Sequence, residues 1–93
     1  MQAPVADLAS LHSYSCNSGE TIAATYPSAD SATIRYKGST YNMLIAISAS
    51  GARYVDGDLE WWTRGSGAGS EGTLSRQGAN GAPDQSIESC IES

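Results

Sequence analysis

Residues 31–47, SATIRYKGSTYNMLIAI, decide the fold because they hold two strand-like segments joined by a tight turn. In the first segment Ala32, Ile34 and Tyr36 alternate with polar side chains, as in a strand with one buried face. Lys37-Gly38-Ser39 is a turn signal between the two segments and indicates an antiparallel hairpin. Apolar side chains occupy both phases of residues 40–47, so we expect this strand to be buried on both sides or sharply bent.

The same pattern extends in both directions, because turn signals rich in Gly, Asn, Asp and Pro separate short apolar segments. We predict strands at about residues 11–16, 21–26, 31–37, 40–47, 52–56, 59–64, 70–76 and 86–91. Their short connections indicate antiparallel neighbours, so the fold class is all-β. Eight short strands are typical of a small closed barrel or a sandwich.

The length of 93 residues fits one domain, which we place at residues 11–93 after a flexible lead-in at residues 1–10. Ten acidic and five basic residues give a formal net charge of −5 without any Lys/Arg cluster. This charge argues against nucleic acid or an anionic membrane as a partner and favours a cationic one. No apolar run is long enough for membrane insertion. The start, MQAP, does not resemble a signal peptide, so we expect a mature sequence.

Cys16 and Cys90 are the two cysteines, and they lie near opposite ends of the chain. Their separation excludes a CxxC motif, which leaves inert thiols of a cytosolic protein or a disulfide. In a small Gly- and Ser-rich domain we favour the disulfide, which implies an oxidising compartment. Cys90 is in phase with Glu88 and Glu92, so the bridge is expected on the outer surface or at an irregular strand end.

Catalytic and metal-binding patterns are weak throughout the sequence. His12 is the single histidine and no GxSxG turn is present, so we predict a non-catalytic strand histidine and no enzyme. One His and two distant Cys do not form a zinc site, and no metal or other cofactor is predicted. The acidic stretch 56–60, DGDLE, could bind calcium or act as a carboxylate pair, but a tight hairpin turn is the favoured interpretation.

Trp61 and Trp62 are adjacent on a predicted strand, so their side chains point to opposite faces. We expect at least one indole in the core. The other could serve as a sugar-stacking platform or an interface anchor.

The stretch 47–65, ISASGARYVDGDLEWWTRG, resembles the MliC/PliC family, the membrane-bound and periplasmic inhibitors of c-type lysozyme. Residues 50–54, SGARY, match the family's SGxxY motif. Residues 61–65, WWTRG, match its aromatic-Trp-x-Lys-Gly segment, with Arg64 in place of the usual Lys. An early YSCNSG segment at residues 14–19 and the late Cys90 extend the resemblance.

This resemblance implies an eight-stranded antiparallel β-barrel, closed by the disulfide, that blocks c-type lysozyme. Ser50 and Arg64 are implied to enter the lysozyme cleft and contact its catalytic carboxylates, while Gly51 removes a side chain where the loop must approach closely. Tyr54 is implied to support this loop, and Gly65 completes the lysozyme-binding residues.

The resemblance also implies a periplasmic location, with the soluble branch favoured because no lipid-accepting cysteine lies near the start of the chain. A small periplasmic β-barrel that binds a carbohydrate or another ligand is the alternative function. The oligomeric state is left open.

Overall fold

The computed structural model describes residues 11–65, 67–77 and 83–93, and for residues 83 and 84 the backbone alone. The predicted lead-in at residues 1–10 lies outside these ranges. All regular elements of the described residues are strands. They are β1 (His12–Cys16), β2 (Thr21–Ser28), β3 (Ser31–Tyr36), β4 (Ser39–Ala46), β5 (Ala52–Val55), β6 (Leu59–Arg64), β7 (Glu71–Gln77) and β8 (Pro83–Glu92).

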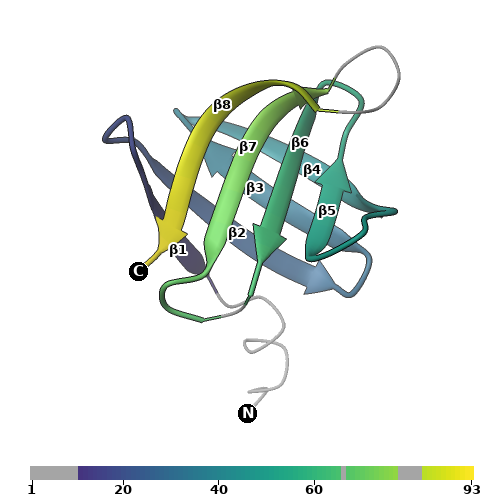
Figure 1. The fold of residues 1–93 in the computed structure, drawn as a ribbon, viewed down its shortest axis with the longest axis horizontal. Coiled ribbons are helices and arrows are strands. Elements are labelled where there is room, and N and C mark those ends of the chain that lie inside the picture. The colour runs from purple at the N-terminus through teal and green to yellow at the C-terminus, as the bar shows by residue number, and fades with distance from the viewer. Residues whose placement is uncertain (1–10, 66, 78–82) are drawn as a thin grey trace.

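The eight strands form a closed barrel in which each strand pairs with the next in the chain (Figure 1). Every pair is antiparallel, and β8 returns to pair with β1, so the sheet has no free edge. The prediction of an all-β barrel is therefore confirmed, and the alternative of a sandwich is wrong. The predicted strand positions also agree closely with the observed ones.

Alternate side chains of the strands fill the barrel interior, and Trp61 lies at its centre with no exposed surface. Tyr14 packs edge-on against Trp61, with ring centroids 4.9 Å apart. Gly72 faces the same indole, because a Cβ atom at this position would lie 2.4 Å from Trp61 Cη2. Trp62 points to the outer face and is only half-buried, so the prediction of one inward indole is confirmed.

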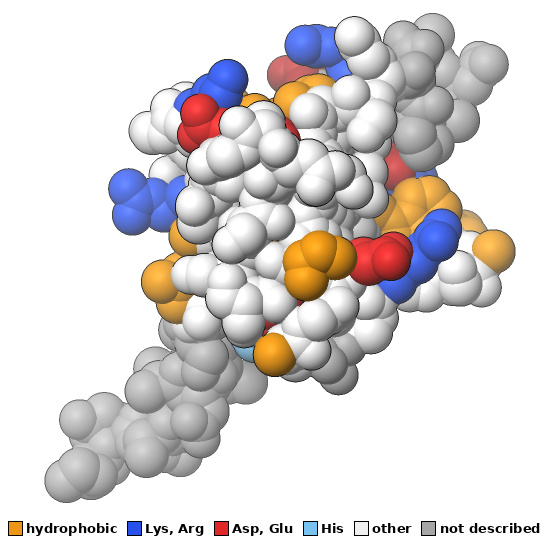
Figure 2. All heavy atoms as spheres, turned by 60° about the vertical axis from the view of Figure 1, so that its left-hand side comes forward, with side chains coloured by type: hydrophobic (Ala, Val, Ile, Leu, Met, Phe, Trp, Pro, Cys, Tyr) orange, Lys and Arg blue, Asp and Glu red, His pale blue; other side chains and the backbone are white. Residues whose placement is uncertain are grey.

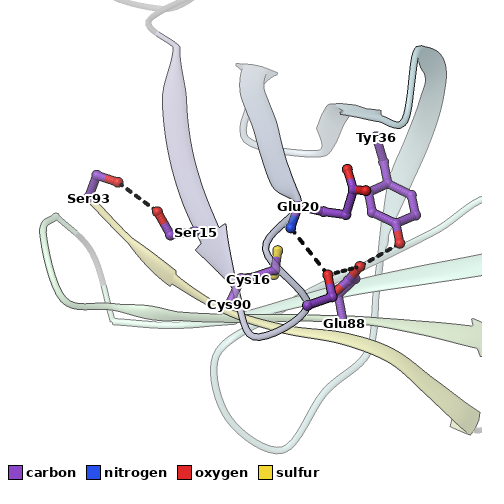
Figure 3. The surroundings of a disulfide bond; sticks show 8 residues. Ser15, Cys16, Glu20, Tyr36, Glu88, Cys90 and Ser93 are labelled. Carbon is purple, nitrogen blue, oxygen red and sulfur yellow. Dashed lines mark hydrogen bonds between the residues drawn. A yellow bond between two sulfur atoms is a disulfide. The ribbon is translucent and has the colours of Figure 1, made fainter.

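The disulfide joins β1 to β8 at the point where the barrel closes, since Cys16 and Cys90 are directly paired in register (Figure 3). Both cysteines are buried, so the expectation of a bridge on the outer surface is wrong. Cys90 and Glu88 lie on the same face of β8, as predicted, but this face points into the barrel. The interior accepts Glu88 because its carboxylate receives hydrogen bonds from Tyr36 Oη at 2.5 Å and Ser18 Oγ at 2.8 Å.

The hydrogen bond from Tyr36 holds the pKa of Glu88 below its usual range, despite burial. Glu92, the last residue of β8, also points inward. His12 Nδ1 lies 2.7 Å from its carboxylate, and Ser70 Oγ donates to it at 2.9 Å. Burial opposes ionisation of Glu92, but these two contacts outweigh it and lower its pKa. Hydrogen bonds thus allow two acidic residues to point into the barrel.

The prediction that the strand at residues 40–47 is buried on both sides is wrong. Met43 is buried, but Leu44 is 67% exposed and Ile47, just beyond the end of β4, is 94% exposed. β4 pairs with β3 without a shift in register, so no bulge diverts the strand. The physical reason is that a single-layered barrel buries one face of each strand, and the outer apolar side chains meet solvent.

Candidate functional site

The predicted site residues come together at one end of the β5–β6 hairpin. Ser50 and Gly51 belong to the loop that precedes β5, and Arg64 is the last residue of β6. The pairing of Ala52 with Thr63 places this loop beside the end of β6. The Asp56-Gly57-Asp58 turn lies at the opposite end of the same hairpin (Figure 1).

Gly51 allows the loop to lie directly on β6. Its φ angle is +70°, in the left-handed region that favours glycine. A Cβ atom at Gly51 would lie 2.2 Å from the carbonyl oxygen of Thr63 and 3.1 Å from Nε1 of Trp62. The close approach that requires glycine at position 51 is therefore the approach of the loop to β6 of the same chain.

Three hydrogen bonds hold the loop at residues 47–51 in place. Trp62 Nε1 donates to the carbonyl oxygen of Ser50 at 2.8 Å, and Arg53 Nη1 donates to that of Ile47 at 3.1 Å. Ser48 Oγ donates to the carbonyl oxygen of Gly51 at 3.0 Å. The loop backbone is therefore fixed against the barrel, while Ser50 itself is exposed.

Arg64 is exposed beside the ring of Trp62, with its guanidinium carbon 5.6 Å from the ring centroid. The guanidinium carbon of Arg53 lies 6.0 Å from the same centroid. Both distances fall within the range of cation–π attraction. Arg53 also donates through Nε to Glu60 Oε1 at 2.7 Å, and the Glu60 side chain is almost fully buried.

Tyr54 and Gly65 lie on either side of this arrangement. Tyr54 points into the barrel, where it is buried and packs against Tyr26 with ring centroids 5.7 Å apart. Burial raises the pKa of Tyr54, and its ring forms part of the packed barrel interior. Gly65 has a φ angle of +84° and turns the chain out of β6 immediately after Arg64.

The segment after Gly65 is anchored at its far end by Ser70. Ser70 Oγ lies 2.7 Å from the carbonyl oxygen of Gly67, to which it donates. The amide of Gly69 donates to the carbonyl oxygen of Glu92 at 2.9 Å, so this segment is tied to the end of β8. The two loops at this end of the barrel are therefore both held by hydrogen bonds in their described residues.

A surface hollow of about 210 Å³ lies over the outer face of β6 and β7, next to Arg64. Trp62 and Glu60 contribute to its wall. The indole that lines it already bonds Ser50 and contacts two guanidinium groups, so it offers little support for the predicted sugar-stacking role. Figure 2 shows the side that lies at the left of Figure 1, where apolar and charged side chains form small, separate groups.

Sequence reasoning did not identify Arg53 and the N–H of Trp62 as contacts that hold the site together. Strand alternation offered a signal, because Arg53 and Trp62 form a cross-strand pair on the outer face. The side chain of Arg53 lies two residues from Gly51 and can therefore reach back to the loop. Its place between Gly51 and Tyr54 in SGARY gave no indication of this role.

The other candidate sites have structural explanations. Asp56 Oδ1 accepts hydrogen bonds from the amides of Asp58 at 2.9 Å and Leu59 at 2.8 Å, which confirms the tight turn. His12 contacts Glu92 rather than a nucleophile. Among the described residues, no three His, Cys, Asp or Glu side chains gather as metal ligands would. Within the same ranges, no helix has the length and apolar character needed to cross a membrane.

Comparisons with known proteins agree with the resemblance seen in the sequence. The family model described as membrane-bound lysozyme-inhibitor of c-type lysozyme, MliC, matches residues 14–83. A membrane-bound lysozyme inhibitor of C-type lysozyme from Cupriavidus necator is 40% identical over 75 residues. The match covers 75% of this chain and 57% of the relative, so the chain spans little more than half of that protein's length. No solved structure matches the chain.

The family comprises inhibitors rather than enzymes, in agreement with the prediction of no enzymatic activity. The matched range includes the loop at residues 47–51, Arg64 and all of β1–β7 from Tyr14 onward. The chain therefore belongs to the MliC family, the membrane-bound lysozyme inhibitors of c-type lysozyme.

Proposed function

We propose that the protein inhibits c-type lysozyme by inserting the loop at residues 47–51 and the side chain of Arg64 into the enzyme's active-site cleft. The observation that carries the proposal is the joint placement of Ser50 and Arg64, both exposed, on a backbone fixed by Trp62 and Gly51. An inhibitor with its contact groups already held in place loses little conformational entropy on binding. Family membership supports lysozyme as the partner.

The chemistry of the two side chains suits a cleft that contains catalytic carboxylates. The hydroxyl of Ser50 can donate one hydrogen bond to a carboxylate oxygen. The guanidinium of Arg64 brings a permanent charge and a planar set of donors that can engage one or both acids. Gly51 and Gly65 shape the backbone around these donors, and Tyr54 supports the loop from the barrel interior.

Long-range electrostatics favour the same partner. The chain has a formal net charge of −5. A cationic lysozyme would be attracted to it before contact, which raises the association rate more than it slows dissociation. We further propose that the protein acts in the periplasm as a soluble inhibitor, where an oxidising environment maintains the Cys16–Cys90 bridge.

The test is a wall-lysis assay in which c-type lysozyme is titrated with the parent protein and with variants. The parent should abolish lysis at near-stoichiometric amounts. Arg64→Ala should weaken inhibition by about 2–5 kcal/mol, because it leaves buried carboxylates without their charged partner. Ser50→Ala should cost less, about 1–3 kcal/mol, since a neutral donor is lost. Arg64→Lys should retain substantial inhibition.

Arg35→Ala is the matched control, because Arg35 is also exposed but lies on β3, away from the hairpin. It changes the net charge by the same amount as Arg64→Ala and should leave the affinity close to that of the parent. A folded Ser50→Ala, Arg64→Ala double variant that inhibits as well as the parent would contradict the proposed site.

A further inference from the structure

Trp62 contacts both halves of the proposed inhibitory site. Its indole N–H donates to the carbonyl oxygen of Ser50, and its ring lies beside the guanidinium of Arg64. Its neighbour Trp61 points the other way and is buried at the centre of the barrel. The two adjacent tryptophans therefore have separate tasks, one in the core and one at the surface.

We infer that Trp62 is a positioning residue, which sets the direction of Ser50 through its N–H and that of Arg64 through its ring. This inference rests on the proposed function, because it concerns how the same two contact groups are held before lysozyme arrives. Trp62 is not itself assigned a contact with the lysozyme carboxylates.

The ring of Trp62 is needed to orient the guanidinium of Arg64, because this group lies at the end of a long, flexible side chain. Among the described residues, Arg64 forms no ion pair, although Glu71 is its cross-strand partner on β7. The face of an indole attracts a guanidinium group without neutralising it. The side chain of Arg64 can therefore be ordered in the free protein while its charge remains available to a partner.

Arg53 completes the arrangement around the same ring. It also lies within cation–π distance of Trp62, but its charge is paired with Glu60 at 2.7 Å. Its Nη1 holds the carbonyl oxygen of Ile47, at the start of the loop, while Trp62 holds that of Ser50 near the end. The loop is thus fixed to the barrel at two points, and Trp62 contacts both the loop and the guanidinium of Arg64.

The indole N–H cannot be replaced by another aromatic ring. A Cβ atom on Gly51 would lie only 3.1 Å from Trp62 Nε1, which shows how closely the loop backbone passes over this nitrogen. Phenylalanine at this position would keep a ring beside Arg64 but leave the carbonyl of Ser50 without its donor. Leucine would remove both interactions. The two substitutions therefore separate the two tasks.

The experiment measures lysozyme inhibition by Trp62→Phe and Trp62→Leu, each made in the parent and in Arg64→Ala. Trp62→Phe should weaken inhibition about three- to tenfold, the usual effect of one lost hydrogen bond. Trp62→Leu should weaken it by a further two- to fivefold, the usual size of an exposed cation–π contact. In the Arg64→Ala background the difference between Phe and Leu should be smaller than in the parent, because only the contact of the ring with Arg53 then distinguishes them, whereas the loss due to the missing N–H should remain.

Trp61→Phe is the matched control, because it also removes one indole hydrogen bond, from Trp61 Nε1 to Tyr26 Oη at 3.0 Å. This bond lies inside the barrel, so the control should lower thermal stability while inhibition by the folded protein stays within about twofold of the parent. A merely structural role for Trp62 would give the same pattern as this control.

The free protein provides a readout that does not depend on lysozyme. In NMR spectra of the parent, the side-chain protons of Arg64 should be shifted upfield by the ring of Trp62, and the shift should vanish in Trp62→Leu. Unshifted Arg64 protons in the parent would overturn the inference whether or not the protein inhibits lysozyme. Unchanged inhibition by both Trp62 variants, alongside a loss in Arg64→Ala, would also overturn it and leave the proposed function intact.

Discussion

Replacing Gly51 with alanine should displace the loop at residues 47–51, and the structure gives the size of the effect. An alanine at the observed φ of +70° costs roughly 1–2 kcal/mol, because its Cβ crowds the following carbonyl. The same Cβ would also lie 2.2 Å from the carbonyl oxygen of Thr63. That oxygen cannot move easily, since Thr63 is paired on both sides, with Ala52 and Gly72.

The chain can relieve this overlap only by moving the loop away from β6. The movement would break the hydrogen bond from Trp62 to Ser50, at a cost of about 1 kcal/mol. If the loop did not move, the overlap of the new Cβ with the Thr63 carbonyl would instead cost about 1–3 kcal/mol as overpacking. Backbone strain and the lost hydrogen bond together should therefore lower the free energy of unfolding of Gly51→Ala by about 2–3 kcal/mol. It should weaken lysozyme inhibition at least about fivefold, because Ser50 is misplaced.

Gly57→Ala is the matched control for backbone strain. Gly57 also has a positive φ, of +98°, but a Cβ atom there would have no neighbour within 4 Å. It lies in the turn at the far end of the hairpin, so the variant should lose about 1–2 kcal/mol of stability and no inhibition. Urea unfolding and a wall-lysis assay measure the two effects. Equal stability losses with unchanged inhibition in both variants would refute the reasoning.

Three other properties should follow from the structure. Reduction of the Cys16–Cys90 bridge should lower the free energy of unfolding by roughly 4 kcal/mol in the chain-entropy model, as urea denaturation with and without reductant can measure; equal stability would contradict this. The pKa of Glu88 is lower in the folded than in the unfolded state, so its stabilising contribution is complete above about pH 4.3, the ordinary value, and is lost as the pH falls through the folded value. Glu88→Gln should therefore be less stable near neutral pH and lose less stability on acidification. If the free energy of unfolding of the variant fell with decreasing pH as steeply as that of the parent, this role of Glu88 would be contradicted. Added salt should slow association with lysozyme more than it speeds dissociation. Stopped-flow association rates that do not change with ionic strength would exclude electrostatic steering.

Local sequence patterns were sufficient to predict the strands and their antiparallel neighbours, because strand alternation and turn chemistry are local properties. The choice of a barrel over a sandwich came from the family resemblance. Ala32, Ile34 and Tyr36 alternate in the sequence and are buried in the structure, and the Lys37-Gly38 turn joins the strands as expected. Local patterns do not state which face is the inner one. The apolar residues Leu44 and Ile47 therefore seemed buried, although they lie on the outside or beyond the end of a single-layered barrel.

The position of the disulfide depends on contacts between distant residues, which explains why its side of the sheet was predicted wrongly. Glu88 seemed an outer residue because it is acidic. Tyr36 and Ser18, far from it in the sequence, supply the hydrogen bonds that let it point inward beside Cys90. The same limit applies to the site. The motifs SGARY and WWTRG suggest which residues matter, but they do not show how these residues contact one another. The bond between Trp62 and Ser50 appears only when the two segments lie side by side.

The central claim is that Ser50 and Arg64 occupy the substrate cleft of c-type lysozyme. The most direct measurement is a calorimetric titration of lysozyme with this protein, with and without a chito-oligosaccharide that fills the cleft. If the two ligands share the cleft, an oligosaccharide concentration about 100 times its own Kd should raise the apparent Kd of the inhibitor about a hundredfold. An apparent Kd that does not change with the cleft filled would contradict the account, because the protein would then bind lysozyme elsewhere.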